Sequence, residues 1–316
     1  MECSLRQIAS ILKNAGSIVV TAHIHPDGDS LGSMLGLNQY LLSCGKSVQM
    51  VIDDDVPRRY EFLPGSKNIV QPQDITITPD LLVVLDASDI ERIGAVNRIS
   101  RVPILNIDHH ISNTKFADYW YVNSNAAATG EIILDLLNME NVAINSEIAT
   151  CLYTAIATDC GFFRYANTTA HTHGCAAQLI KCGVRPHVIS EHMETKPLES
   201  LTRTLEVLKT LELFFDGKIA AVSIEHSNAD SADSTEGLIN YPRNIEGVEI
   251  AIMFTFADQN TARVSFRSRS VDVSALALTF GGGGHIRAAG CTVIGSKDEV
   301  KTKVIKAAAQ LIGGKL

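Results

Sequence analysis

The segment TAHIHPDGDSLGS, Thr21 to Ser33, places two histidines and two aspartates in a short loop between two different periodic patterns. The β-branched run before it, residues 17–20, is typical of a strand. The apolar residues after it recur at helical spacing over residues 31–42. The loop therefore lies at the carboxyl end of a strand, where open α/β sheets place their ligand crevices. Capping and turn chemistry explains one of these polar residues but not all four.

The patterns along the following residues predict a parallel sheet. Strands are expected at residues 47–52, 81–85, 102–107 and, less regularly, 162–165. Helices are expected at residues 129–137, 146–158 and 170–182. Strands that alternate with helices over short connections predict an α/β domain with a parallel sheet and helices on both faces.

The second part of the chain predicts a smaller α/β domain. Residues 185–216 indicate a linker and a connecting helix, so we expect domains at 1–184 and 217–316. Strand patterns occur at residues 218–224, 248–256, 263–268 and 290–294, and a closing helix at residues 297–312. A length of 316 residues fits two domains.

The composition is that of a soluble globular enzyme, with 46% hydrophobic and 20% charged residues. No signal peptide or membrane span is recognisable, so we expect a cytoplasmic protein without a membrane partner. Seven cysteines without a CxxC pair argue against a disulfide framework and a structural zinc site. We assign no chemistry to His171, which lies near a predicted helix start.

Metal-type ligands follow the ends of three predicted strands. These ends carry His23, Asp86 and the triplet Asp108-His109-His110. Carboxylates and imidazoles suit divalent ions such as Mn²⁺. Four carboxylates would roughly cancel the charge of two dications, and two ions can hold a hydroxide between them for attack at phosphorus. The candidate ligands are His23, Asp27, Asp29, Asp86, His109 and Asp159, with Asp86 suited to bridging.

Each of these residues has an ordinary structural alternative. Asp86 and Asp108 can cap a following helix, and His109 can be a core histidine that bonds a carbonyl. Asp159 can pair with Arg164. These alternatives explain any one residue by itself, but the clustering of all of them favours a metal site.

A run of four glycines, Gly281 to Gly284, precedes His285. Glycines such as Gly283 and Gly284 let backbone N–H groups approach an anion closely. Arg267 and Arg269 alternate on a strand, so both face one side, and arginine binds phosphate in bidentate fashion. A flexible turn with solvated arginines is the structural alternative.

These motifs carry a resemblance to a known family. HIHPDGDSLGS, VVLDASD, Asp108-His109-His110 and ATDCGFFRY resemble the four motifs of the DHH phosphoesterase superfamily, in order. GGGGHIRAAG resembles the hallmark of the DHH-associated C-terminal domain. The length and the FFRYANTT continuation are similar to the NrnA-like branch, which comprises nanoRNA exonucleases that also remove the 3′-phosphate of pAp.

The resemblance implies a ligand set and a catalytic group. One Mn²⁺ would be held by His23, Asp27 and Asp86. The other would be held by Asp29, Asp86, His109 and Asp159. His110 would face the scissile phosphate as stabiliser or proton donor. His25 departs from the asparagine common in this family, and we expect it to support the ligands rather than to bind an ion.

The resemblance also implies the substrates and partners. We expect a manganese-dependent phosphoesterase with two ions per chain, for which Mg²⁺ or Co²⁺ can substitute. Its substrates would be short RNA oligonucleotides and pAp, gripped at their far end by Arg267, Arg269 and His285, and the chain would form a homodimer. Long duplex nucleic acid is disfavoured, because the net charge is −8 and no extended basic track is present.

Two alternatives remain open on the same motifs. One is a phosphodiesterase for cyclic or linear dinucleotides, such as c-di-AMP and pApA. The other is a module that senses nucleotides without cleaving them, which a missing ligand would mark, and no ligand is missing. A manganese pyrophosphatase shares the first motifs but would need a Ser-Arg-Lys signature in place of GGGGH.

Overall fold

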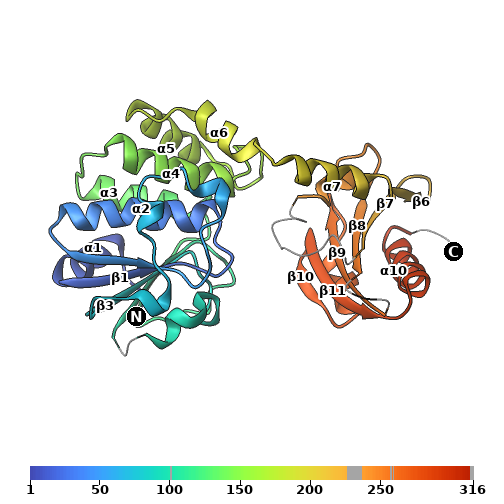
Figure 1. Ribbon diagram of the computed structural model, residues 1–316, viewed down its shortest axis with the longest axis horizontal. Coiled ribbons are helices and arrows are strands. Elements are labelled where there is room, and N and C mark those ends of the chain that lie inside the picture. Colours follow the sequence, from blue (N-terminus) through green and yellow to red (C-terminus); the bar gives the residue numbers. More distant parts are fainter. Residues whose placement is uncertain (100–101, 226–236, 257, 259, 314–316) are drawn as a thin grey trace. The chain divides into compact units, whose positions relative to one another are not determined.

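The computed structural model describes residues 1–99, 102–225, 237–256, 258 and 260–313. The chain divides into an N-terminal unit, Met1–Thr195, and a C-terminal unit, Lys196–Leu316. Both units combine a sheet with helices (Figure 1).

The N-terminal unit is built on a five-stranded parallel sheet with the order β2-β1-β3-β4-β5. Its strands are β1 (Ser17–Thr21), β2 (Ser47–Val51), β3 (Leu81–Leu85), β4 (Ile104–Asp108) and β5 (Tyr119–Val122). The central strand β3 is buried along its whole length. This arrangement confirms the predicted α/β fold class.

The α-helices pack on one face of this sheet, where Ile18, Val83 and Ile107 join a core that includes residues of α2 and α4. The alternate residues of the strands, such as Val19 and Leu82, face a smaller core on the other side. That side is covered by the 3₁₀ helix η4 (Glu91–Arg98) and its flanking loops. The helices of the main face are α1 (Leu5–Asn14), α2 (Gly28–Ser43), α3 (Thr129–Met139), α4 (Ser146–Asp159), α5 (Ala170–Lys181) and α6 (Pro186–Glu194).

Helix α2 is buried on almost all sides rather than on one stripe. Three glycines at intervals of four residues, Gly28, Gly32 and Gly36, face α4. A Cβ at Gly32 would lie 2.3 Å from the backbone oxygen of Cys151, so only glycine permits this approach. Leu42, the last residue of the predicted apolar periodicity over residues 31–42, has 51% of its surface exposed.

One prediction for the N-terminal unit is wrong. Residues 162–165 form turns and no strand, because Phe162 and Phe163 adopt φ values of 54° and 64° in place of an extended backbone. Helix α6 lies inside the predicted linker, and its Ile189 is buried in the core of the N-terminal unit. Pro186 at the first helical position begins this helix.

The C-terminal unit contains a six-stranded mixed sheet with the order β10-β11-β9-β8-β7-β6. Helices α9 and α10 cover one face, and α7 and α8 contact the β7 and β8 region. The strands are β6 (Glu212–Phe214), β7 (Ile219–Ile224), β8 (Ile250–Phe256), β9 (Thr261–Ser268), β10 (Gly283–His285) and β11 (Ala288–Ile294). The helices are α7 (Leu198–Leu208), α8 (Asn240–Arg243), α9 (Val273–Leu278) and α10 (Lys297–Leu311).

Two short strands of this sheet escape sequence prediction. β6 has three residues, and β10 takes up the second half of the glycine run, where the sequence indicates a break. Among the helices that the structure describes, none is long and apolar enough to cross a bilayer.

Candidate metal centre

The candidate centre lies at the carboxyl edge of the parallel sheet. In the sheet, Thr21 pairs with Val84, and Val84 pairs with Asn106, so β1, β3 and β4 end side by side. His23, Asp86 and His109 each follow one of these strands. The three predicted strand ends therefore meet at one edge, as parallel pairing requires.

The first group of ligand atoms belongs to His23, Asp27 and Asp86, and these atoms lie within 4.8 Å of one another. His23 Nε2 is 3.7 Å from Asp27 Oδ1 and 3.4 Å from Asp86 Oδ2. Asp27 is the N-cap of α2, and its side chain accepts a hydrogen bond from Ser30 N at 3.0 Å.

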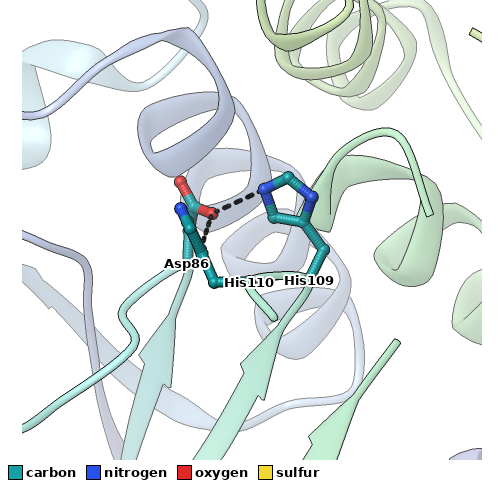
Figure 2. Close-up of side chains that lie close together, drawn as sticks. All are labelled: Asp86, His109 and His110. Atoms are coloured by element: carbon teal, nitrogen blue, oxygen red, sulfur yellow. Dashed lines mark ion pairs between the residues drawn. The ribbon is translucent and has the colours of Figure 1, made fainter. Parts of the chain in front are cut away.

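The second group belongs to Asp29, His109 and Asp159. His109 Nε2 is 3.8 Å from Asp29 Oδ2 and 3.6 Å from Asp159 Oδ2, the carboxylate at the end of α4. It is also 3.6 Å from Asp86 Oδ1 (Figure 2). One oxygen of Asp86 thus faces His23 and the other faces His109, so this carboxylate lies between the two groups.

The donor set fits divalent cations. The nitrogen–oxygen distances of 3.4–3.8 Å exceed those of a good hydrogen bond. Two ligand atoms each about 2.1 Å from one ion, at an angle of about 110°, lie about 3.4 Å apart. The spacing therefore suits atoms that share an ion better than atoms that bond each other.

The two imidazoles turn their Nε2 atoms toward the carboxylates. His23 Nδ1 lies 2.7 Å from Ile24 O, and His109 Nδ1 lies 3.3 Å from Ala126 O. A carbonyl oxygen only accepts, so each Nδ1 carries a proton and each Nε2 is the ring nitrogen that faces the carboxylates. Metal-bound histidines are held by the same type of contact at Nδ1.

Burial makes the negative charge of the cluster costly. Asp29 and Asp86 have 1% and 2% of their surface exposed. Burial and the Asp86 charge raise the pKa of Asp29 well above its usual value. Burial also raises the pKa of Asp159 to about 6, although His109 opposes the shift. Because the carboxylates repel one another, bound cations would stabilise this arrangement.

The positively charged form of the imidazole is favoured at His23. Burial lowers the pKa of His23, but Asp27 and Asp86 outweigh it and raise this pKa to about 10. The same pairing outweighs burial at Asp27 and lowers its pKa to about 2. The site thus favours positive charge between these residues, which a dication would supply in place of a proton.

The start of α3 holds two of the carboxylates, and sequence reasoning missed this contact. Asp29 accepts hydrogen bonds from the backbone N–H groups of Thr129 at 2.6 Å and Gly130 at 2.9 Å. Thr129 Oγ1 also donates to Asp86 Oδ1 at 3.1 Å. Ala128 at the N-cap has no side chain to satisfy these N–H groups, so Asp29 takes that place. An alanine at a helix start is the one sequence signal that could have indicated the contact.

The backbone of Asp86 is turned at the end of β3. Its φ of 56° lies in the left-handed region, where side chains other than glycine are uncommon. Conformations of this kind cost about 1–3 kcal/mol and cluster at functional sites. Asp86 therefore does not cap a helix, and its strained backbone aims the carboxylate between the two histidines.

His110 lies at the rim of the centre with 33% of its side chain exposed. Its Nδ1 is 2.7 Å from Asp108 Oδ1. The same atom is 3.6 Å from Asp86 Oδ1 (Figure 2). Burial lowers the pKa of His110, but the hydrogen bond to Asp108 outweighs it and raises this pKa. Asp108 also accepts from His109 N at 2.8 Å and from Asn113 Nδ2 at 2.6 Å. Asp108 therefore orients the histidine pair.

Two neighbouring residues lie outside the ligand groups. His25 has 77% of its side chain exposed, and its Nδ1 is 3.4 Å from Asp54 Oδ2. Arg164 donates from Nε to the carbonyl of Gly161 at 2.7 Å.

The predicted substrate residues gather on the C-terminal unit. Ala288 of β11 pairs with Arg267 on one side and with His285 on the other, so these side chains share one face of the sheet. Gly284 has a φ of 141°, and a Cβ there would lie 2.5 Å from Ala289 Cα. Arg269 follows the end of β9 and is exposed. Ala288, which lies between Arg267 and His285 on this face, is a small residue.

Comparisons with known proteins agree over nearly the whole chain. Residues 17–156 match the DHH family N-terminal domain, and residues 216–314 match the DHHA1 domain. The bifunctional oligoribonuclease and PAP phosphatase NrnA of Thermus thermophilus is 33% identical over 96% of this chain and 93% of that protein. The protein of the same name from Mycoplasma pneumoniae is 26% identical over 94% of each chain. The solved structure of an exopolyphosphatase-related protein from Bacteroides fragilis has a TM-score of 0.88 and 26% identity, and covers 97% of this chain and 95% of its own.

Proposed function

Because this chain belongs to the DHH phosphoesterase family, in its NrnA-like branch, and is a phosphoric ester hydrolase, we propose that it hydrolyses short oligoribonucleotides and the 3′-phosphate of pAp. Relatives named as oligoribonucleases and PAP phosphatases support this choice of substrates. The reaction would take place at the candidate metal centre with two divalent ions, for which Mn²⁺ is our first choice.

One observation carries the proposal. The two groups of ligand atoms lie on either side of Asp86, whose two oxygens face different histidines. His23 and Asp27 would complete one ion site, and Asp29, His109 and Asp159 the other. Mixed carboxylate and imidazole ligands suit Mn²⁺, with Mg²⁺ and Co²⁺ as substitutes. When bound, a pair of such ions polarises the phosphoryl group and lowers the pKa of water that attacks it.

His110 is placed to donate a proton at the rim of the centre. The Asp108 carboxylate holds its Nδ1, so Nε2 remains to face a substrate. The raised pKa of His110 keeps this ring protonated to higher pH than a free imidazole. A protonated ring stabilises developing charge on a phosphate and donates to the leaving oxygen. His110 would thus serve as catalytic acid, while Asp108 positions it.

The C-terminal unit would bind the part of the substrate that does not react. Arg267 and His285 share one sheet face, Arg269 lies two residues further, and Gly283 and Gly284 expose backbone next to them. Arginine forks and open backbone N–H groups suit phosphate oxygens. A homodimer and a cytoplasmic location complete the proposal, and light scattering of the purified chain tests the first of these.

The direct test is phosphate release from pAp and shortening of two- to five-nucleotide RNAs. The chain is treated with chelator, and Mn²⁺ is then added back. We expect activity to vanish on chelation and to return with Mn²⁺, whereas full activity of the metal-free chain would refute the proposal. Relative rates on pAp, pApA, c-di-AMP and longer RNA separate the proposed substrates from the dinucleotide alternative.

A further inference from the structure

A second group of metal-type side chains lies between helices α3 and α5. Asp135 of α3 and His171 and Cys175 of α5 each place one ligand atom within 4.8 Å of the others. We call these three residues the α3–α5 cluster. None of them belongs to the ligand groups of the candidate metal centre.

The contacts of the cluster converge on one imidazole nitrogen. His171 Nε2 is 3.1 Å from Asp135 Oδ2 and 3.5 Å from Cys175 Sγ. Residues four apart on a helix lie on one face, so α5 presents its histidine and its cysteine side by side toward α3. A carboxylate, an imidazole and a thiol at such short range are the ligand types that Zn²⁺ takes in proteins.

The exposure of two of the three side chains allows an ion to reach the cluster from solvent. The side chains of His171 and Asp135 are 55% and 38% exposed, while Cys175 is 4% exposed. Burial raises the pKa of the Cys175 thiol to about 12, so the thiol is protonated at neutral pH. An incoming dication would displace this proton to bulk water and gain a thiolate ligand.

A buried carboxylate next to the cluster supplies an independent observation. Glu131 lies one helical turn before Asp135 and has 1% of its surface exposed. Its Oε2 accepts a hydrogen bond from Ala127 N at 3.0 Å, but its Oε1 has no hydrogen-bond partner in the described part of the chain. The Glu131 charge also acts on Cys175. A buried oxygen without a partner is costly, and a cation one turn away would offset its charge.

We propose that the α3–α5 cluster binds a zinc-class dication through Asp135, His171 and Cys175, with a water in the remaining position. The ion would clip α3 to α5. The N-terminus of α3 holds Asp29 through Thr129, and Asp135 lies six residues, about 9 Å, further along the helix. The site would therefore be structural, and it would fix the helix on which the catalytic centre rests.

The cysteine spacing does not indicate this site, because one ligand alone is a cysteine and the ligands come from two helices. The sequence also does not show that His171 lies beside Asp135 of α3, so His171 resembles an ordinary surface residue. The proposal thus replaces the sequence argument against a zinc site.

Cobalt binding provides the test. A thiolate bound to Co²⁺ gives an intense charge-transfer absorption in the near ultraviolet, and the candidate metal centre offers oxygen and nitrogen ligands only. We expect the full-length chain to show this band with Co²⁺, and Zn²⁺ to remove it by competition. Cys175→Ser and His171→Ala should each abolish the band, whereas Cys182→Ser, at the C-cap of the same helix, should retain it.

The outcomes separate cleanly. Absence of the band in the parent chain, or its persistence in Cys175→Ser, would overturn the proposal. His171→Ala guards against misfolding as the cause, because this side chain is exposed and its removal leaves the buried core intact. Activity on pAp is not used as a readout, so a failed proposal for the catalytic function would leave this result interpretable.

Discussion

Single side chains in the candidate metal centre are held by bonds that leave their reactive atoms free. Carbonyl oxygens bind the Nδ1 atoms of His23 and His109, so both Nε2 atoms face the carboxylates. Asp108 does the same for His110 from a fully buried position. A carboxylate that fixes an imidazole raises its pKa and its basicity. The geometry of the centre therefore depends on residues that need not touch an ion.

The first prediction concerns Asp108 as a positioning residue. Asp108→Asn removes one of the two carboxylate charges, those of Asp108 and Asp86, that raise the pKa of His110. If protonated His110 is the acid, activity falls as pH rises through its pKa. The alkaline fall of kcat/KM should then move to lower pH in this variant, with a loss of about 10–100-fold at the optimum.

A pH–rate profile of Asp108→Asn checks this expectation. Asp55→Asn, an exposed substitution of the same chemistry, is the control and should leave the profile unchanged. An alkaline limb that stays where it is in Asp108→Asn would contradict the assigned role.

The second prediction concerns the stability of metal-free chain. Asp29 and Asp159 have folded-state pKa values above their unfolded values, and that of Asp159 is about 6. Such groups stabilise the fold while protonated, and this stability is lost as pH rises through the folded pKa. His23, with a pKa raised to about 10, changes stability in the same direction. The Tm of chelated chain should therefore fall as pH rises from about 4 to 8.

Thermal unfolding with and without Mn²⁺ measures the effect. Bound Mn²⁺ should make the Tm depend less on pH. Asp159→Asn should have the same effect on the chelated chain. If the Tm of the chelated wild-type chain increases over the same pH range, the electrostatic account of the candidate metal centre is contradicted.

The residue scale shows what the sequence could and could not predict. All six candidate ligands are carboxylates or histidines in short motifs, and the structure brings them to one place. The contacts from Thr129 and Gly130 to Asp29 were not predictable, because a backbone N–H group has no residue signature. The left-handed backbone of Asp86 was hidden for the same reason.

At the scale of elements, the contact between α2 and α4 sets the distance between the two carboxylates of the second ligand group. Asp29 lies in the first turn of α2, and Asp159 ends α4. The glycines of α2 remove the side chains that would separate these helices: at Gly32 the nearest neighbour is the backbone of α4 itself. Close packing of the two helices therefore brings carboxylates from distant parts of the sequence together.

The third prediction tests this packing. Gly32→Ala would place a methyl group 2.3 Å from the oxygen of Cys151, and the helices must separate to admit it. We expect a loss of about 1–3 kcal/mol in the free energy of unfolding together with reduced activity. Denaturant unfolding and phosphate release from pAp measure the two effects.

Gly174→Ala is the matched control. Gly174 lies in α5, and nothing would lie within 4 Å of an added Cβ. Alanine there should stabilise the helix by up to about 1 kcal/mol and leave activity unchanged. Equal effects of the two substitutions would contradict the role of the glycines in α2.

Helices and strands were predictable where a pattern of apolar residues determines them. They were not predictable where the backbone conformation of a few residues determines them. The continuous apolar sequence of β3 predicts this strand. The aromatic run at Phe162 suggested a strand, but three consecutive left-handed residues beginning at Gly161 turn the chain directly after Asp159. Strand β10 went unpredicted because its glycines have low strand propensity and are held by pairing with β11.

On the scale of the whole molecule, we propose that the two units carry out two different tasks. The candidate ligands all lie in Met1–Thr195, and the phosphate-binding candidates all lie in Lys196–Leu316. We propose that residues 185–216 connect these two functions. Loss of a group in the C-terminal unit should then weaken substrate binding and leave the chemical step intact.

The fourth prediction follows from this division. Arg267→Ala should raise the KM for pAp about tenfold, the effect expected for one charged hydrogen bond, and change kcat little. Lys303→Ala, on α10, which packs against the opposite face of the sheet, should change neither constant. Steady-state kinetics of both variants give the comparison, and an unchanged KM for Arg267→Ala would rule out its assigned role.

The fifth prediction addresses the central claim that side chains from three strand ends and two helices hold a pair of ions. Mn²⁺ bound per chain is measured by equilibrium dialysis, with Cys175→Ser as the parent so that the α3–α5 cluster cannot contribute. We predict two Mn²⁺ ions per chain, and loss of both, with at least a 100-fold fall in pAp hydrolysis, in Asp86→Ala. A parent chain that binds one ion or none, or an Asp86→Ala variant that retains two ions and normal turnover, would contradict the account.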